Sequence, residues 1–329
     1  MDILNRKAVY DVIGIGSALL DFIVRVDDAD LDAFGLTKGG MQLIDEGRSR
    51  EILARLAGRE MEISPGGSAA NTLAGLAMLG GQGVFLGTVG TDEHGDRYIQ
   101  ETEKSGVKTQ ISRHDSMTGH AITFITPDSE RSFATHLGAA LHFGSDNVSE
   151  ELIKKSKIIH FEGYLFEPPN LREACMRAIE IAKRNDVLVS IDLSDPSLIE
   201  RIRPIFNEVT REYADILFVN EEEAKVFTGK EREDALKDIH DLCQFAVVKL
   251  GEEGSLIETG DTVYRIPSYR TDVVNTNGAG DMYDAGVLYG ITSGFRADRA
   301  GKIGSYLSSK VVSQVGARLP GTVSIRSVS

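Results

Sequence analysis

The stretch Asn275-Thr276-Asn277-Gly278-Ala279-Gly280-Asp281 is followed at once by Met282-Tyr283-Asp284-Ala285-Gly286-Val287, which has apolar residues at near-helical spacing. Small residues at the start of a helix leave backbone N–H groups unpaired at the positive end of the helix dipole. Because residues 278–280 carry almost no side chain, a bulky anion can approach this backbone closely. If that anion is the transferring phosphate of ATP, Asp281 can take a proton from an attacking hydroxyl. The alternative is a tight strand-to-helix turn with Asp281 as an ordinary N-cap.

The composition limits the class of protein. The chain has 329 residues, 41% of them hydrophobic, which is enough for one large α/β domain or two small ones. Its net charge of −14 argues against nucleic acid as a main partner, although a local phosphate site is still compatible with it. The two cysteines, Cys175 and Cys243, make neither a disulfide framework nor a zinc site. Without a bilayer-length apolar run or a signal-peptide pattern, we expect a soluble cytoplasmic protein with no membrane partner.

Strand-like and helix-like segments alternate through much of the chain. Strands are expected at residues 9–16, 84–90, 157–163, 187–192, 216–220 and 245–251, with helices between them, for example at 95–104 and 171–184. Strands separated in this way form a parallel sheet that is covered on both faces. Ligands of such sheets bind at the carboxyl ends of the strands. Asn220, Gly251 and the loop at 275–281 all lie at such ends.

Two regions depart from the alternation. Residues 121–126 and 131–136 have no helix between them and are typical of an antiparallel β-hairpin. Together with residues 18–44, they are expected to form a small sheet that stands off the main body as a lid. The predicted large domain therefore comprises residues 8–17, 45–117 and 138–325, and the predicted lid comprises residues 18–44 and 118–137.

Two polar residues lie in otherwise apolar or small-residue segments. Asp21 lies in residues 17–26, which are expected to continue the first strand, and it is either exposed at a sheet edge or paired with a ligand hydroxyl. Asn71 lies one helical turn after Gly66 and Gly67, whose lack of side chains lets a ligand lie against the backbone. The alternative for Asn71 is a tolerated polar residue in a helix chosen for close packing.

Three motifs coincide in order and spacing. They are Gly66-Gly67-Ser68-Ala69-Ala70-Asn71, Asn220-Glu221-Glu222-Glu223 and Asn277-Gly278-Ala279-Gly280-Asp281. On these motifs the chain resembles the ribokinase-like (PfkB-type) carbohydrate and nucleoside kinases over nearly its whole length. The resemblance implies an α/β fold, with a three-layer α/β/α domain, a mostly parallel central sheet and a small β-sheet lid. It also implies a phosphotransferase that uses ATP and Mg²⁺ and phosphorylates an alcohol group.

The resemblance further assigns roles to individual residues. Asp281 matches the catalytic base, and Thr276 to Gly280 match the loop whose N–H groups bind the γ-phosphate. Asn220 and Glu223 match the motif that organises Mg²⁺ and the ATP phosphates, with Glu223 acting through water. The expected catalytic residues are Asp281, Gly278, Ala279 and Gly280, the expected metal residue is Glu223, and the expected nucleotide-binding residues are Asn220, Lys249, Gly251, Thr276 and Asn277. The expected acceptor-binding residues are Asp21, Gly66, Gly67, Asn71, Gln42 and Arg131.

Two positions leave alternatives open. Arg131, on the second strand of the hairpin, either covers the phosphates when the lid closes or is a solvated arginine. Asn275 stands where the family usually has Asp, a carboxylate that helps to hold a potassium-type ion in some relatives. An amide offers an oxygen but no charge, so dependence on a monovalent cation is in doubt for this chain.

The acceptor is the least determined part of the prediction. Residues 16–21, 38–45 and 128–140 look most similar to the adenosine-kinase branch, and apolar lid residues suit a flat base, unless they are only the lid's own core. We therefore expect a nucleoside, most of all adenosine converted to AMP. The alternatives are a sugar kinase acting on ribose, fructose or a keto-deoxy sugar, and a nucleotide-binding regulator without catalysis, against which the intact Asp281 and Glu223 argue. The predicted oligomeric state is a monomer or a homodimer.

Overall fold

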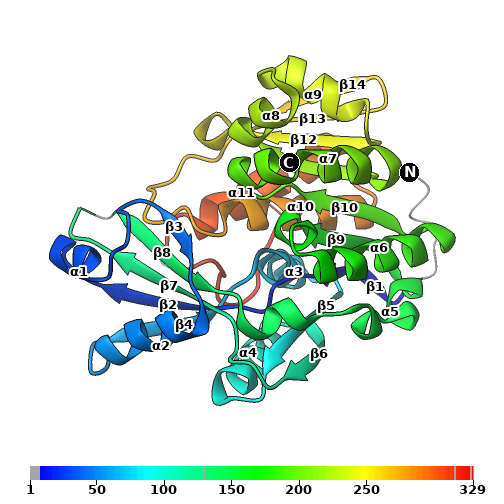
Figure 1. Ribbon diagram of the computed structural model, residues 1–329. Coiled ribbons are helices and arrows are strands. Elements are labelled where there is room, and N and C mark those ends of the chain that lie inside the picture. Colours follow the sequence, from blue (N-terminus) through cyan, green and yellow to red (C-terminus); the bar gives the residue numbers. More distant parts are fainter. Residues whose placement is uncertain (1–7, 129, 315, 327, 329) are drawn as a thin grey trace.

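The strands form two separate sheets (Figure 1). The computed structural model describes residues 8–128, 130–314, 316–326 and 328. In spatial order, the larger sheet contains β14 (Thr262–Ile266), β13 (Ser255–Thr259), β12 (Phe245–Lys249), β11 (Ile216–Asn220), β10 (Leu188–Asp192), β9 (Ser156–Glu162), β1 (Tyr10–Ile15), β5 (Gly83–Gly90) and β6 (Lys108–His114).

The larger sheet is mostly parallel, as the alternation of strands and helices predicted. From β12 to β6 every pair of neighbouring strands runs parallel. At the other edge, β13 and β14 form an antiparallel hairpin on β12. The parallel order requires crossover helices, and these cover both faces of the sheet.

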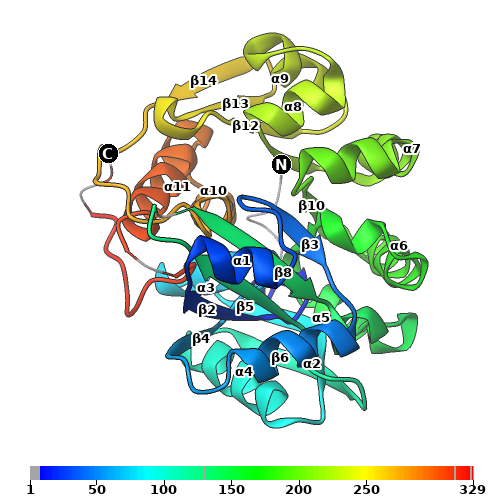
Figure 2. The ribbon, with the colours of Figure 1, turned by 60° about the vertical axis from the view of Figure 1, so that its left-hand side comes forward.

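The helices and the sheet make three layers (Figures 1 and 2). One face is covered by α5 (Glu150–Lys154), α6 (Pro169–Arg184), α7 (Pro196–Tyr213), α8 (Glu221–Thr228) and α9 (Arg232–His240). The other is covered by α3 (Ser68–Met78), α4 (Glu93–Lys104), α10 (Ala279–Thr292) and α11 (Ala297–Val311). Within β11, Leu217 and Val219 pack on the first face, and Ile216 and Phe218 pack on the second, as the two-residue period of a strand requires.

The smaller sheet stands beside the larger one, at the left of Figure 1. In spatial order it contains β3 (Met41–Leu43), β8 (Arg131–His136), β7 (His120–Ile125), β2 (Leu20–Arg25) and β4 (Met61–Pro65). The antiparallel pairing of β7 with β8 confirms the predicted hairpin. Helices α1 (Asp28–Ala33) and α2 (Glu46–Arg55) lie with this sheet, and short 3₁₀ helices span Gly138–His142, Ser145–Asn147, Gly163–Phe166 and Gly251–Glu253.

The structure corrects two expectations from the sequence. The first strand does not continue to residue 26, because β1 ends at Ile15 and β2 begins a new strand in the other sheet. Residues 45–117 were expected to belong to the large domain, but β4 within this range pairs with β2 of the smaller sheet. Because β4 lies on the far side of β2, Asp21 is on an interior strand, and the edge-exposed interpretation of this residue is wrong.

Among the helices of the described ranges, none has the length and apolar character that a membrane span requires. Both cysteines are buried and unpaired, as the sequence suggested.

Candidate functional site

Polar side chains gather at the carboxyl edge of the parallel sheet. Strand β9 ends at Glu162, β10 at Asp192, β11 at Asn220 and β12 at Lys249. The register places Asp192 beside Glu162, and Asn220 beside Lys249. This edge of a parallel α/β sheet is where ligands bind.

The loop that enters α10 has no side-chain cap. Gly278 is the N-cap residue, with φ 73° and ψ 2°, a left-handed conformation that glycine adopts without strain. A Cβ at this position would lie 2.6 Å from the backbone oxygen of Ala317. Asp281 therefore is not the N-cap, and the interpretation of this stretch as an ordinary capped turn is wrong. The uncapped N–H groups of the first turn are instead available to an anion.

Asp281 is held by the start of α3. Ser68 Oγ donates to Asp281 Oδ1 at 2.7 Å, and Asn71 Nδ2 donates to Oδ2 at 2.9 Å. Burial raises the pKa of Asp281, and these two hydrogen bonds partly oppose that rise. The carboxylate is thus oriented by two donors and more basic than a free aspartate, which are the properties of a general base.

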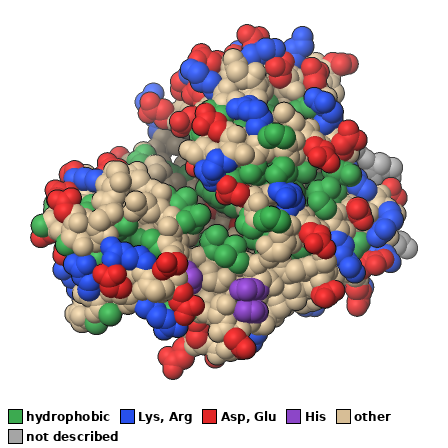
Figure 3. All heavy atoms as spheres, viewed as in Figure 1, with side chains coloured by type: hydrophobic (Ala, Val, Ile, Leu, Met, Phe, Trp, Pro, Cys, Tyr) green, Lys and Arg blue, Asp and Glu red, His purple; other side chains and the backbone are tan. Residues whose placement is uncertain are grey.

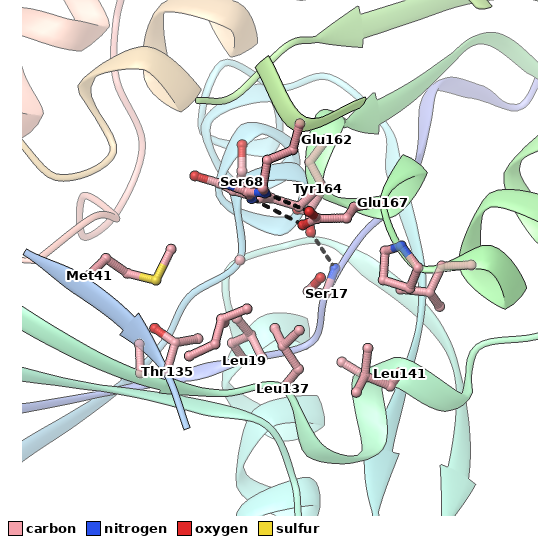
Figure 4. Close-up of a pocket in the computed structure, with 17 residues that line it drawn as sticks. Ser17, Leu19, Met41, Ser68, Thr135, Leu137, Leu141, Glu162, Tyr164 and Glu167 are labelled. Atoms are coloured by element: carbon pink, nitrogen blue, oxygen red, sulfur yellow. Dashed lines mark hydrogen bonds and ion pairs between the residues drawn. The ribbon is translucent and has the colours of Figure 1, made fainter. Parts of the chain in front are cut away.

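Two cavities lie at this site, and we name them by their position; Asp281 lines only the loop cavity. The loop cavity is lined by residues 276–281 together with Asp192, Asn220, Glu223, Lys249 and Gly251. The inter-sheet cavity lies between the smaller sheet and the large domain, and its lining includes Ser17, Leu19, Met41, Leu43, Gly67, Ser68, Leu137, Leu141, Glu162, Tyr164 and Glu167 (Figure 4). Ser68 and Tyr164 line both cavities, so the two spaces meet beside Asp281.

The inter-sheet cavity is mainly apolar. In the space-filling view, hydrophobic side chains gather where the smaller sheet meets the large domain (Figure 3). Met41 and Leu43 of β3 line the cavity although 48% and 58% of their surface is exposed. Gln42 lies between them, is exposed and does not line the cavity. Side chains alternate along a strand, so the structure does not bring the predicted residue Gln42 to this site.

Glu162 joins the ends of β1 and β9 to the start of α3. Its Oε1 accepts from Ser17 N at 2.7 Å (Figure 4). Its Oε2 accepts from Ala69 N at 3.1 Å. The side chain is buried, and burial raises its pKa while the two backbone donors lower it. This carboxylate stabilises the loop between β1 and β2, which is the wall of the inter-sheet cavity.

Asn220 and Glu223 form a reciprocal cap on α8. Asn220 Oδ1 accepts from Glu223 N at 2.8 Å, while the Glu223 carboxylate accepts from Asn220 N at 2.8 Å and from Asn220 Nδ2 at 2.6 Å. Burial, and then the neighbouring charge of Asp192, raise the pKa of Glu223 to about 8. A buried carboxylate near another carboxylate is stabilised by a cation, and Lys249 already supplies one such charge here. Within the described residues, no group of three or more His, Cys, Asp or Glu side chains is arranged to hold a metal by itself.

Lys249 lies beneath the loop cavity and bridges two aspartates. Its Nζ is 2.7 Å from Asp192 Oδ2 and 3.2 Å from Asp284 Oδ1. Burial disfavours the ammonium, but the two carboxylates outweigh this effect and raise the pKa of Lys249. A Cβ on Gly280 would lie 3.3 Å from Nζ, so the cation is close under the loop. The predicted nucleotide-binding residue Lys249 therefore lies at the site, where its ammonium is already paired with Asp192 and Asp284.

Asp21 lies against the paired glycines, of which Gly67 lines the inter-sheet cavity. A Cβ on Gly66 would be 2.8 Å from both Asp21 carboxylate oxygens. Gly67 has φ +85°, and a Cβ there would be 2.2 Å from Ser17 O. Burial raises the pKa of Asp21 to about 6, opposed by Arg318 and reinforced by Asp281. The predicted cluster of Asp21, the two glycines and Asn71 is thus brought next to Asp281.

The smaller sheet also reaches the loop directly. Arg131, at the start of β8, donates from Nη1 to Asn275 Oδ1, and this oxygen accepts a second bond from Asn277 N at 2.8 Å. Asn275 is buried, and its Nδ2 has no protein partner among the described residues. Arg131 is therefore not a freely solvated arginine, because it links the two sheets at the loop.

Residues 29–323 match the family described as pfkB family carbohydrate kinase. The chain belongs to this family. A pfkB-family protein is a phosphotransferase with an alcohol group as acceptor, and kinases of this kind use ATP and usually Mg²⁺. The ribokinase-like resemblance drawn from the three motifs is confirmed.

The relatives of this pfkB-family chain include both nucleoside and sugar kinases. The structure of the adenosine kinase from Sinorhizobium meliloti has a TM-score of 0.88 and 36% identity, covering 96% of this chain and 97% of that chain. A probable sugar kinase from Rhizobium etli CFN 42 has a TM-score of 0.89 and 34% identity, covering 96% of both chains. Adenosine kinase from Saccharomyces cerevisiae is 29% identical over 330 residues, which cover 93% of this chain and 96% of that protein.

Three polar residues that the sequence motifs do not include are brought to the site by the structure. Glu162 and Asp192 end predicted strands, so the rule that ligands bind at carboxyl ends could have identified them. Arg318 approaches Asn71 from the end of the chain, and no motif in the sequence points to it.

Proposed function

We propose that this pfkB-family kinase transfers the γ-phosphate of ATP to a primary hydroxyl of a nucleoside, and that adenosine, converted to AMP, is the favoured acceptor. One observation carries the proposal: an apolar inter-sheet cavity meets the loop cavity beside Asp281. An apolar cavity with few polar groups suits a flat base better than a bare sugar. The similarity to adenosine kinases over nearly the whole chain supports the same choice.

In this proposal Asp281 is the catalytic base. It removes the proton from the acceptor hydroxyl as the oxygen attacks phosphorus, while Ser68 and Asn71 keep the carboxylate oriented. The backbone N–H groups of residues 278–280, at the N-terminus of α10, stabilise charge on the transferring group. Asp21, Asn71 and the backbone of Gly66 and Gly67 bind the other hydroxyls of the acceptor.

The residues present fit ATP and Mg²⁺. The loop cavity is built around glycine backbone, and a further cavity that shares Gly251 and Thr276 with it offers space for the nucleoside part of ATP. Glu223 is buried and lines the loop cavity together with Asp192, and both effects raise its pKa, so a bound cation would stabilise its carboxylate. Asn220 and Glu223 would hold Mg²⁺, with water completing its shell. The ion would neutralise charge on the phosphates during transfer.

The smaller sheet is proposed to act as a lid. It carries Met41 and Leu43 on the cavity side and Arg131 on the loop, so its movement toward the large domain would cover the acceptor and exclude water. The lid would comprise residues 18–44 and 118–137, as the sequence predicted, together with β4. That the enzyme works in the cytoplasm as a monomer or homodimer stays a prediction.

A sugar acceptor is the second candidate. It is favoured by the polar side chains of Asp21 and Asn71 next to the paired glycines and by the comparable likeness to a probable sugar kinase. In that case, Met41 and Leu43 would only complete the core of the lid.

The decisive experiment is ADP release with Mg-ATP across adenosine, guanosine, inosine, cytidine, ribose, fructose and keto-deoxygluconate. Turnover on adenosine supports the proposal, turnover on a sugar alone supports the second candidate, and none with any acceptor contradicts both. The Asp281→Asn variant should lose about 10²–10⁴-fold in kcat while still binding ATP. Asp298→Asn, in the first turn of α11, is the matched control and should keep full activity. An active Asp281→Asn enzyme would exclude Asp281 as the base.

A further inference from the structure

The end of the chain returns to the transfer site. The Ala317 backbone packs against Gly278, where a Cβ would be 2.6 Å from Ala317 O. The next residue, Arg318, points its guanidinium to the opposite side of the site, toward the start of α3. Residues 317 and 318 therefore contact both the loop of α10 and the wall that carries Asn71.

The Arg318 guanidinium makes three bonds with its three nitrogens. Nε donates to Asn71 Oδ1 at 2.8 Å, Nη2 donates to Gly66 O at 3.1 Å, and Nη1 donates to Thr102 Oγ1 at 3.3 Å. Asn71 and Thr102 are buried, and Gly66 is buried next to Gly67. These bonds hold the Gly66 backbone and the Asn71 side chain next to Gly67 and Ser68, which line the inter-sheet cavity.

A guanidinium can donate hydrogen bonds but cannot accept them, whereas a side-chain amide has one end of each kind. Because Arg318 faces one end of the Asn71 amide, that end must be Oδ1. The other end, Nδ2, then faces Asp281 Oδ2 at 2.9 Å. If the amide were reversed, an oxygen would face the carboxylate of Asp281 and a donor would face the guanidinium, and both contacts would be repulsive.

We propose that Arg318 is a positioning residue for phosphoryl transfer, which fixes the orientation of Asn71 so that its Nδ2 supports the carboxylate of Asp281. The role rests on the proposed function of Asp281 as the base. Arg318 acts through Asn71 and does not touch the transferring group. It also completes the acceptor wall, because it binds Gly66 O and lies close to the Asp21 carboxylate.

Electrostatics point in the same direction. Burial raises the pKa of Asp21, and the Arg318 charge is the main influence that lowers it. Burial raises the pKa of Asp281, the hydrogen bonds from Ser68 and then Asn71 lower it, and the charges of Asp192 and Lys249 act on it in opposite directions. Loss of Arg318 should therefore make both carboxylates easier to protonate.

The test compares the wild type with Arg318→Met, Arg318→Lys and the control Arg326→Met, an exposed arginine of the same terminal segment. In Arg318→Met we expect kcat to fall about tenfold or more and the acidic limb of the kcat profile to move to higher pH, with ATP affinity within about twofold. Arg318→Lys should show a smaller shift in the same direction, because lysine keeps the charge but not the fork of donors. Arg326→Met should match the wild type.

A second readout needs no acceptor. Carboxyl ¹³C NMR with labelled aspartate, assigned with Asp281→Asn, should show Asp281 titrating at higher pH in both Arg318 variants than in the wild type. An unchanged Asp281 titration, or an unchanged acidic limb, would overturn the proposal. If Arg318→Met does not fold, the Arg318→Lys titration decides alone. If the wild type phosphorylates no acceptor, the proposed function fails, while the NMR titration still tests Arg318.

Discussion

Lys249 allows the construction of the loop cavity to be tested quantitatively. Its ammonium is 2.7 Å from Asp192 and 3.2 Å from Asp284, and the side chains of these aspartates are only 8% and 1% exposed. Replacement by methionine keeps the volume of the side chain but leaves the carboxylates without their cation. Breaking a buried ion pair costs about 3–5 kcal/mol, a large share of the roughly 5–15 kcal/mol that stabilises a typical protein.

The loss in Lys249→Met should depend on pH. Burial acts to raise the pKa of Asp192, and Lys249 is the main influence that holds it below its usual value. Without Lys249, the pKa of Asp192 in the folded protein should rise above its value in the unfolded chain. Such a carboxylate destabilises the folded state above its unfolded pKa, and the cost disappears on protonation. The loss of stability should therefore shrink between about pH 7.5 and about pH 5.5.

Urea denaturation at the two pH values measures the free energy of unfolding directly. The double variant Lys249→Met/Asp192→Asn should recover most of the loss, because it removes the unpaired charge. Lys225→Met is a matched control, because Lys225 pairs with Glu231 at the exposed surface and the variant should lose little stability. The reasoning is refuted if Lys249→Met loses no more than this control, or if its loss is independent of pH and the double variant recovers nothing.

Three further predictions concern the acceptor wall and the loop. Gly67→Ala should lose at least about 2 kcal/mol of stability in urea denaturation, because its Cβ would lie 2.2 Å from Ser17 O at φ +85°. Gly58→Ala has a similar φ of +87° but open space around the Cβ, so it should lose less. Equal losses in the two variants would contradict the predicted clash. Because the pKa of Asp21 is about 6 and the carboxylate is the better hydroxyl acceptor, KM for the acceptor should rise about tenfold per pH unit below pH 6. Asp21→Asn should have a high KM that does not change with pH, and a wild-type KM that is constant down to pH 5 would exclude this role. Turnover should differ by less than about twofold between sodium and potassium buffers, because the Asn275 amide has no charge to hold a cation. Strong activation by potassium would contradict this prediction. Asn275→Asp, which restores the charge, is the variant to compare in the same buffers.

The sequence alone determined the features that depend on local patterns. Alternating strands and helices predicted the mostly parallel sheet, and two strands without a helix between them predicted the β7–β8 hairpin. The small residues before Asp281 predicted a helix start with unpaired N–H groups, because these residues have no side chain that could cap or shield the backbone. The hairpin and the helix start are each encoded in one short segment, and the alternation is a succession of such segments along the chain.

Tertiary structure alone decided which polar groups meet. Asp281 is 210 residues from Asn71, and Asn71 is 247 residues from Arg318, yet all three lie in one hydrogen-bonded chain. Pairing with β2 likewise places β4 in the smaller sheet. The alternation of side chains along β3 leaves Gln42 outside the lining of the cavity. Periodicity predicts whether a residue is in a strand or a helix, but the partner of a buried charge depends on which segments pack together. That choice is made by the free energy of the whole fold, because a buried polar group is costly until a distant partner satisfies it.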